Sequence, residues 1–282
     1  GCVYVISTKF HIGVSNLVQQ PSGLHPRSTL PGVAIGASGG IGAELIRQYQ
    51  LWSAATGQPT QIYATYHNHE PRAESGVNWL HLDLRSTESI ALVGEQLQQL
   101  QQTQQIQALD HWICCSGYLH GEFGEPEKAM KSLHGEKLLG DFAVNSIGPL
   151  LMLQTSLGLL KKSPLAKAAF LSAQVGSIED NRSGGWYGYR MSKAALNMGI
   201  RCAAIECARW RQPPIIVALH PGTTLSGLSQ PFTARRSPAP QSAHACAQDL
   251  FALINRLTLE HNGQFLRCLL YTSDAADEKY RV

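Results

Sequence analysis

Gly36-Ala37-Ser38-Gly39-Gly40-Ile41-Gly42 is the stretch that decides the fold of this 282-residue chain. The apolar residues 33–35 precede it and the amphipathic residues 41–50 follow it, which predicts a turn between a strand and a helix. Glycines let a backbone turn tightly and approach a ligand closely, and a helix N-terminus attracts phosphate through its free amides and its dipole. We therefore expect a dinucleotide site here, contacted by Gly36, Ser38, Gly40, Ile41 and Gly42.

Apolar runs alternate with amphipathic stretches along the rest of the chain, which is typical of a parallel sheet covered by helices. Neither a repeat nor a proline-rich linker divides the pattern. It predicts an α/β fold in a single domain, a doubly wound, mostly parallel Rossmann-type sheet of about seven strands with helices on both faces. Further strands are expected at residues 61–66, 78–82, 109–115, 168–172, 215–219 and 263–267, and further helices at 86–102, 140–160, 187–210 and 243–257.

The two ends of the chain do not follow this pattern. Residues 1–30 contain no Asp or Glu, and we interpret them as a lead-in, either disordered or the remnant of an organelle transit segment. Residues 31–267 make the predicted domain. Residues 268–282 lose the strand and helix pattern, and we interpret them as a tail foreign to the fold.

The composition excludes several classes of function. The net charge is only +3 and the basic residues are scattered, so a nucleic-acid partner is not expected. No run of about 18 apolar residues predicts a membrane span. Seven cysteines without C-x2-C spacing favour free thiols in a reducing compartment over a zinc site. We expect a cytoplasmic protein without a metal, with organelle import as the open alternative.

Tyr189 and Lys193 lie four residues apart, on one face of the helix predicted at 187–210. A free tyrosine, with a pKa of about 10, is a poor acid at neutral pH, and a nearby ammonium group lowers that pKa. Hydride transfer to a carbonyl group needs a proton donor and stabilisation of the developing charge. The pair therefore indicates a catalytic centre that acts on a small carbonyl or alcohol substrate.

These motifs, in this order, resemble those of the short-chain dehydrogenase/reductase family over roughly residues 31–267. Within the family, residues 177–181 and 184–187 are most similar to the C-factor and sniffer-like carbonyl reductase branch. The resemblance implies carbonyl reductase chemistry at Tyr189 and Lys193. It also implies a homodimer or homotetramer built on the helices predicted at 140–160 and 187–210.

The resemblance assigns further residues. Asp83 and Leu84 correspond to the family's adenine-contacting pair, and Asn145 to its helix asparagine. That asparagine bends its helix and holds a water molecule that relays protons to the lysine. The nicotinamide side of the cofactor is expected at Pro221, Gly222 and Ser226. The family's Asn-Asn-Ala-Gly is replaced by Cys114-Cys115-Ser116-Gly117, in which Gly117 still permits close approach of the cofactor.

The family's catalytic serine has no direct counterpart. Counting three residues back from Gly176 gives Ala173, and Ser172 stands one residue earlier. Side chains alternate along a strand, so an offset of one residue changes the direction of the side chain. We assign the role to Ser172, with Ser177 as the alternative.

The end of the second predicted strand indicates which dinucleotide binds. An acidic residue there binds the ribose 2′-hydroxyl of NAD and would repel the 2′-phosphate of NADP. No Asp or Glu occurs there before Glu70, whereas Ser38, His67 and Arg72 could bind a phosphate. The sequence favours NADP(H) over NAD(H).

Two functions stay open at this point. Intact Asn145, Tyr189 and Lys193 favour an NADP-dependent oxidoreductase. Ala173 and the replaced Asn-Asn pair favour a dinucleotide-binding signalling or sensor protein of low activity on the same fold. The oxidoreductase is the main prediction, and the sensor protein is the alternative.

Overall fold

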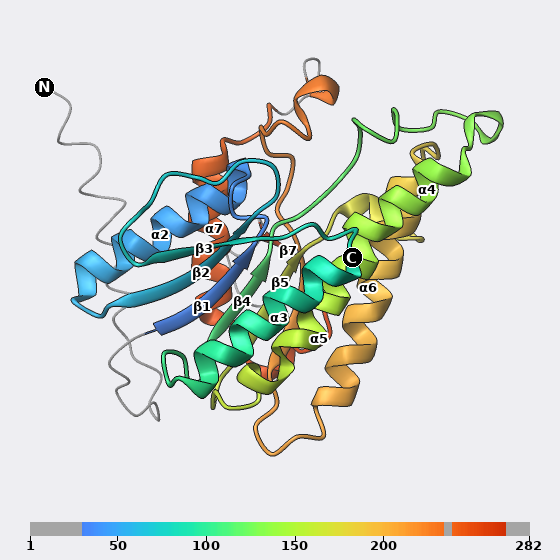
Figure 1. Cartoon of the computed structure of the whole chain (residues 1–282). Helices are drawn as coiled ribbons and strands as arrows, with labels where there is room; N and C mark the ends of the chain where they lie inside the picture. Colours follow the sequence, from blue (N-terminus) through green and yellow to red (C-terminus); the bar gives the residue numbers. More distant parts are fainter. Residues whose placement is uncertain (1–29, 234–238, 269–282) are drawn as a thin grey trace, which may run out of the picture.

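The computed structural model of the chain describes residues 30–233 and 239–268 (Figure 1). The segments 1–29 and 269–282, and with them most of the predicted lead-in and tail, lie outside these residues. Seven parallel strands form one sheet in the order β3-β2-β1-β4-β5-β6-β7. They are β1 (Leu30–Ile35), β2 (Thr60–Tyr66), β3 (Val77–His81), β4 (His111–Cys114), β5 (Lys167–Leu171), β6 (Ile215–His220) and β7 (Phe265–Arg267).

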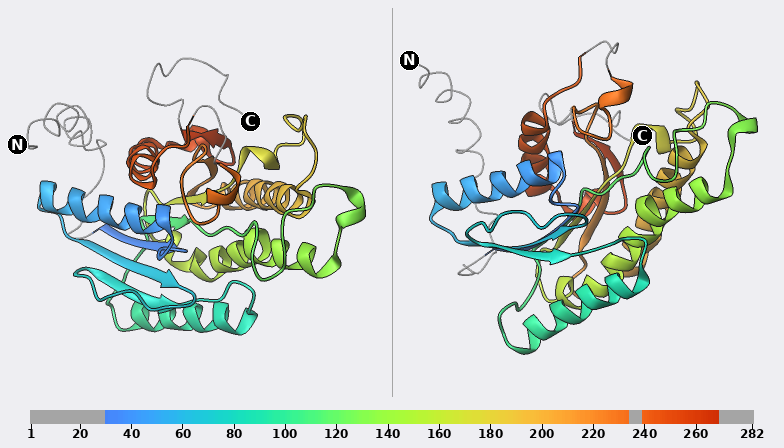
Figure 2. Two further views of the ribbon diagram at one scale, coloured as in Figure 1. Left: turned by 90° about the horizontal axis from the view of Figure 1, so that it is seen from above. Right: turned by 45° about the horizontal axis from the view of Figure 1, so that its top comes forward.

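Helices cover both faces of the sheet, as Figures 1 and 2 show. Helices α2 (Gly40–Thr56) and α7 (Ala243–Arg256) pack against each other on one face. Helices α3 (Thr87–Gln102), α5 (Gly148–Leu160) and α6 (Tyr187–Cys207) lie on the other. The predicted α/β fold is confirmed, including β7 as an edge strand.

The helix predicted at 140–160 is longer than expected and is not uniform. It begins as α4 (Gly135–Phe142), passes through the π-helical turn η2 (Ala143–Ile147) and continues as α5. Short 3₁₀ turns complete the fold, namely η1 (Met130–Ser132), η3 (Gln174–Gly176), η4 (Gln230–Phe232) and η5 (Leu259–His261). Residues 135–160 are long and apolar enough to cross a membrane. Half of their most apolar window is buried in the fold, as in a core helix.

Apolar side chains fill the space on both sides of the sheet. Trp112 and Phe170 lie under α3, α5 and α6, and the indole nitrogen of Trp112 donates a hydrogen bond of 3.0 Å to Ser156. The opposite core includes Leu250 and Cys268. Cys268 is only 2% exposed, so the folded part extends through the residue at which the tail was expected to begin.

The strand order places the functional site. Strand β1 lies between β2 and β4, so the connections that leave β1 and β4 diverge to opposite faces of the sheet. In open α/β sheets a crevice forms at the carboxyl ends of the strands at this reversal. The glycine-rich turn after β1 and the loop after β4 meet at that point.

A buried histidine sits at the opposite end of β4. His111 is 5% exposed, and its Nδ1 lies 2.6 Å from the hydroxyl of Tyr49. Burial, together with the positive charge of Lys167, lowers the pKa of His111 to about 3. The fold therefore holds this ring neutral, whereas the unfolded chain protonates it below about pH 6.5.

This difference predicts acid sensitivity of the fold. The folded-state pKa lies below the unfolded value, so stability is lost as the pH falls from about 6.5 towards 3. His111→Gln removes the titration and keeps a group able to bond Tyr49. Between pH 7 and pH 4.5 the wild type should lose about 2–3 kcal/mol more unfolding free energy than the variant, measured by urea denaturation. Equal losses in the two proteins would show that His111 does not contribute.

Candidate active site

A cavity of about 550 Å³ opens at the carboxyl ends of β1 to β4, a volume typical of small-molecule sites. The glycine turn, the ends of β2 and β3 and the loop after β4 contribute its walls. No described group of three or more His, Cys, Asp or Glu side chains is placed to hold a metal ion. The predicted cofactor residues that line the cavity are Gly36, Ser38, His67, Asp83, Leu84 and Gly117.

The glycine turn is packed too closely for side chains. Gly36 has a φ of +69°, and a Cβ there would lie 2.9 Å from the backbone nitrogen of Ser116. A Cβ at Gly42 would lie 2.8 Å from Cα of Ala37, so the first turn of α2 rests directly on the preceding loop. These contacts leave bare backbone at the cavity wall and at the helix N-terminus, which fits a pyrophosphate group.

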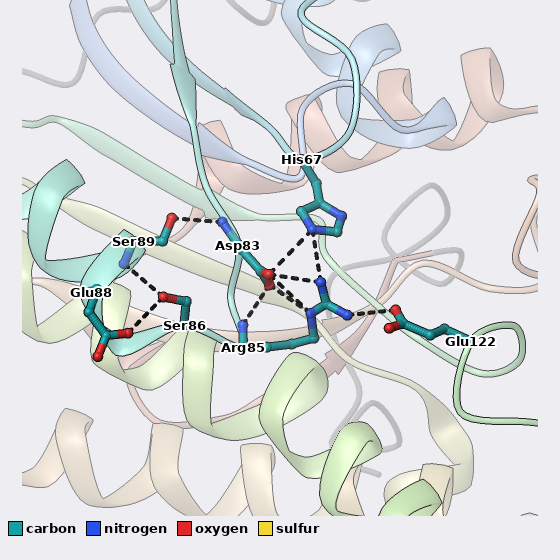
Figure 3. Close-up of polar contacts among 7 residues, drawn as sticks. All are labelled: His67, Asp83, Arg85, Ser86, Glu88, Ser89 and Glu122. Atoms are coloured by element: carbon teal, nitrogen blue, oxygen red, sulfur yellow. Dashed lines mark hydrogen bonds and ion pairs between the residues drawn. The ribbon is translucent and has the colours of Figure 1, made fainter.

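An ionic network forms the adenosine side of this predicted site (Figure 3). Asp83 accepts hydrogen bonds from Arg85, of 2.9 Å from Nε to Oδ1 and 2.8 Å from Nη2 to Oδ2. The hydrogen bonds from Arg85 lower the pKa of Asp83 to about 2. On the other side, Nη1 of Arg85 lies 2.6 Å from Oε2 of Glu122.

Sequence reasoning named His67 and Asp83 in this network but missed Arg85 and Glu122. Arg85 stands two residues after Asp83 in the turn that follows β3, and that spacing was the available signal. Arg72, the cation considered instead, is exposed and does not line the cavity.

The structure brings Tyr189 and Lys193 together at the start of α6. They are 8% and 2% exposed, and Nζ of Lys193 lies 6.0 Å from the centre of the Tyr189 ring. That ammonium nitrogen also donates a hydrogen bond of 2.9 Å to the carbonyl oxygen of Leu171. The two side chains are therefore neighbours in the first turns of α6.

The direction of the Tyr189 pKa corrects our expectation. Burial raises the pKa of Tyr189 to about 12, and the negative charge of Asp141 adds to this. Burial lowers the pKa of Lys193 to about 8. Desolvation therefore outweighs the attraction that was expected to acidify Tyr189. The hydroxyl stays protonated at neutral pH, which suits a proton donor.

Asn145 occupies the middle of the π-helical turn, and helices often bend at such turns. Its side chain is fully buried. Oδ1 accepts from the backbone nitrogen of Tyr118 at 2.7 Å, and Nδ2 donates to the carbonyl oxygen of Tyr118 at 2.8 Å. Nδ2 also lies 3.0 Å from the hydroxyl of Ser192. Asn145 thus ties the loop after β4 to the helix that carries Tyr189.

Ser172, predicted above as the catalytic hydroxyl, has a hydrogen-bond partner of its own on α6. Its Oγ donates a 2.7 Å hydrogen bond to Oδ1 of Asn197, eight residues beyond Tyr189 on α6. Eight residues of helix span about 12 Å, so this bond ties the hydroxyl to a later turn of α6 than the one that carries Tyr189. The alternative, Ser177, accepts from the backbone nitrogen of Asp180 at 3.4 Å.

Pro221, Gly222 and Ser226 lie outside the wall of the main cavity, on the segment that follows β6. A Cβ at Gly40 would lie 3.9 Å from that of Ser226, so this segment reaches the start of α2. Farther along it, the Phe232 ring packs 5.2 Å from that of Trp186. The segment therefore borders both the glycine turn and the region beside Tyr189.

Glu127 is a residue that sequence reasoning missed. It lies in the loop before α4, is 3% exposed, and accepts from two backbone nitrogens at the start of α6. Its carbonyl oxygen lies 2.5 Å from the nitrogen of Trp186, and Oε2 lies 3.2 Å from that of Gly188. Trp186 is the N-cap residue of α6 and has a φ of +51°, but its side chain makes no capping hydrogen bond to the helix. Glu127 supplies this cap from 61 residues away.

A second buried carboxylate packs against the same turn. Asp141 is fully buried and accepts two hydrogen bonds from Nζ of Lys137, at 2.6 and 2.8 Å. A Cβ at Gly188 would overlap Asp141 Oδ2, so only glycine fits there. Burial raises the pKa of Asp141 to about 6.

Comparisons with known proteins found curated relatives and solved structures that are similar to this chain. No protein-family model matches the chain. The C-signal protein of Myxococcus xanthus is 34% identical over 124 residues, which cover 44% of this chain and 70% of that protein. The chain spans 57% and 52% of two further curated relatives, both named as dehydrogenases.

Solved structures show the same architecture. The carbonyl reductase Sniffer of D. melanogaster superposes with a TM-score of 0.72 at 22% identity, over 85% of this chain and 97% of that one. An NADPH-bound carbonyl reductase from chicken fatty liver gives 0.71 at 22% identity, over 88% and 97%. At this identity the likeness shows the shared fold.

The cap from Glu127 predicts a graded mutational response. Glu127→Ala removes the acceptor for Gly188 and should cost about 1–2 kcal/mol of unfolding free energy. Glu127→Gln keeps an acceptor oxygen and should retain most of that stability, and Glu125→Ala, on the exposed part of the same loop, should change little. Chemical denaturation measures all three. If the Gln variant is as unstable as the Ala variant, the charge of Glu127 and not its cap is the stabilising feature.

Proposed function

This chain belongs to the short-chain dehydrogenase/reductase family of oxidoreductases, and on that premise we propose that it transfers a hydride between NADP(H) and a carbonyl or alcohol substrate. The observation that carries the proposal is the pairing of buried Tyr189 with Lys193 on α6. In this proposal Tyr189 exchanges a proton with a substrate oxygen.

The described residues fit a nicotinamide dinucleotide. The glycine turn would hold the pyrophosphate group, Asp83 and Leu84 the adenine, and Lys193 the nicotinamide ribose. When bound, the cofactor supplies or accepts the hydride. A neighbour of the same fold was solved with NADPH bound, which supports this choice.

Tyr189 is the proton donor in the reducing direction. Its raised pKa keeps the hydroxyl protonated until the substrate oxygen gains negative charge. The proton then passes from the phenol to that oxygen, and the ammonium form of Lys193 stabilises the phenolate left behind. Asn145 keeps the loop after β4 in place through its bonds to Tyr118.

A second candidate function is a dinucleotide-binding signalling protein of low turnover. It is favoured by Ala173, which offers no hydroxyl at the family's serine position, and by the engagement of Ser172 with Asn197. The relative named C-signal also fits this reading. Turnover distinguishes the two candidates, since both require the cofactor to bind.

We also propose that the chain forms a homodimer or homotetramer through α5 and α6. Met191, Met198 and Ile205 are 47%, 65% and 50% exposed and lie seven residues apart, hence on one face of α6. A row of large apolar side chains in water favours burial against another copy.

The oligomer predicts a mass above 30.7 kDa. Light scattering at micromolar concentration should give the mass of a dimer or tetramer, and Met198→Glu should shift it towards the monomer because it places a charge in the buried patch. Leu92→Glu, on the equally exposed outer side of α3, serves as the control. A monomeric wild type would reject the proposal.

The proton-donor role is tested by Tyr189→Phe. The phenyl ring keeps the packing but has no proton to give, so reduction should fall at least about 10²-fold while NADPH binding stays nearly intact. Tyr187→Phe, at the first position of the same helix, is the matched control. The assay follows NADPH absorbance over a panel of aldehydes, ketones and quinones. Full turnover by Tyr189→Phe would refute the site, whereas a wild type that binds NADPH but reduces nothing favours the signalling candidate.

A further inference from the structure

The Arg85 side chain begins in the turn after β3 and places its positive charge beside the end of β2. Its Nη2 lies 3.3 Å from Nε2 of His67, the first residue after β2 (Figure 3). In dinucleotide-binding folds the end of this strand discriminates between the ribose 2′-hydroxyl and the 2′-phosphate. The guanidinium group therefore lies beside the first residue after β2, at the end of the strand that makes this discrimination.

The guanidinium group of Arg85 has a partly buried partner, Asp83, on one edge and an exposed partner, Glu122, on the other. Asp83 holds Nε and Nη2 at 2.9 and 2.8 Å, and its own backbone nitrogen is fixed by Ser89 Oγ at 2.9 Å. Nη1 contacts Glu122 instead. The Glu122 side chain is 68% exposed, against 23% for Asp83, so Glu122 is the partner that solvent or a ligand can replace.

The Glu122 side chain stands on an exposed turn that is flanked by glycines. Gly121 and Gly124 bond to each other across a tight turn, and both have the positive φ angles that glycine tolerates, +128° and +109°. Phe123 lies beneath the guanidinium, with its ring centre 5.8 Å from Cζ of Arg85. An ion pair as exposed as that of Arg85 with Glu122 contributes little to stability, so its release is easy.

We propose that Arg85 binds the 2′-phosphate of NADP(H) and that Glu122 occupies the same donor until the phosphate displaces it. This inference rests on the proposed function and adds its specificity-determining residue. Asp83 holds the guanidinium in position, and a phosphate can accept from Nη1 where the Glu122 carboxylate now does. The His67 ring lies beside the same guanidinium group, with Nε2 3.3 Å from Nη2 of Arg85. The unphosphorylated ribose of NAD offers no anion and leaves Glu122 in place.

The test separates the phosphate from the rest of the cofactor. Calorimetric titration with 2′,5′-ADP and with 5′-AMP compares ligands that differ only in the 2′-phosphate. The wild type should prefer 2′,5′-ADP. Arg85→Ala should weaken 2′,5′-ADP about 10- to 100-fold, as for a lost charge-assisted hydrogen bond, and 5′-AMP by less than about threefold. Arg85→Lys should fall between, because lysine lacks the planar fork.

Removing the competitor should act in the opposite direction. Glu122→Gln should tighten 2′,5′-ADP about 3- to 10-fold and leave 5′-AMP unchanged, since it removes a negative charge from the phosphate position. Glu125→Gln, an exposed acid three residues away in the same loop, should tighten it far less. Added salt should reduce the difference between wild type and Glu122→Gln, because screening weakens exposed charges.

The outcomes distinguish this inference from the function on which it rests. Equal losses of both ligands in Arg85→Ala would overturn it, since Arg85 would then only shape the adenosine pocket. A wild type that binds 5′-AMP as tightly as 2′,5′-ADP would also overturn it. Binding of neither ligand would reject the dinucleotide site altogether. Selective 2′,5′-ADP binding without hydride transfer to any substrate would support Arg85 while rejecting the proposed enzyme.

Discussion

The rest of the site depends on one constraint. The N-terminus of α6 packs against two buried acidic residues, Glu127 and Asp141. Glu127 accepts from the backbone of Trp186 and Gly188, and Asp141 fills the space that any side chain at Gly188 would need. Tyr189 follows at once, and Lys193 comes one turn later. Because a helix is rigid, fixing its first turn fixes both side chains, as well as the contacts of Ser192 and Asn197 farther along.

The two ends of the site use electrostatics in different ways. At the adenosine end, Asp83, Arg85 and Glu122 are partly exposed, so their charges persist and partners can exchange. At the catalytic end, Tyr189 and Lys193 are buried. Desolvation raises the pKa of the tyrosine and lowers that of the lysine, so it favours the neutral form of each. A solvated end suits recognition of a charged ligand, and a dry end suits proton transfer.

Sequence reasoning reached the fold because strand, turn and helix signals are local. The glycine turn and the Tyr-x3-Lys spacing each lie within a few residues, and their positions follow from the period of the helix and the strand. Glu127 and Glu122 escaped because their partners stand 61 and 37 residues away. The bond of Ser172 to Asn197 was not foreseen because the direction of the serine side chain depends on where β5 ends. The Tyr189 pKa was misjudged because burial is a property of the assembled fold.

The position of the cavity in the chain has a consequence for the order of assembly. The residues that line it fall between Gly36 and Val144, so roughly the first half of the chain supplies its wall. Tyr189 and Lys193 come later, and the cap from Glu127 cannot form before α6 exists. During synthesis, which proceeds from the N-terminus, the residues of the nucleotide pocket therefore leave the ribosome before the catalytic residues do.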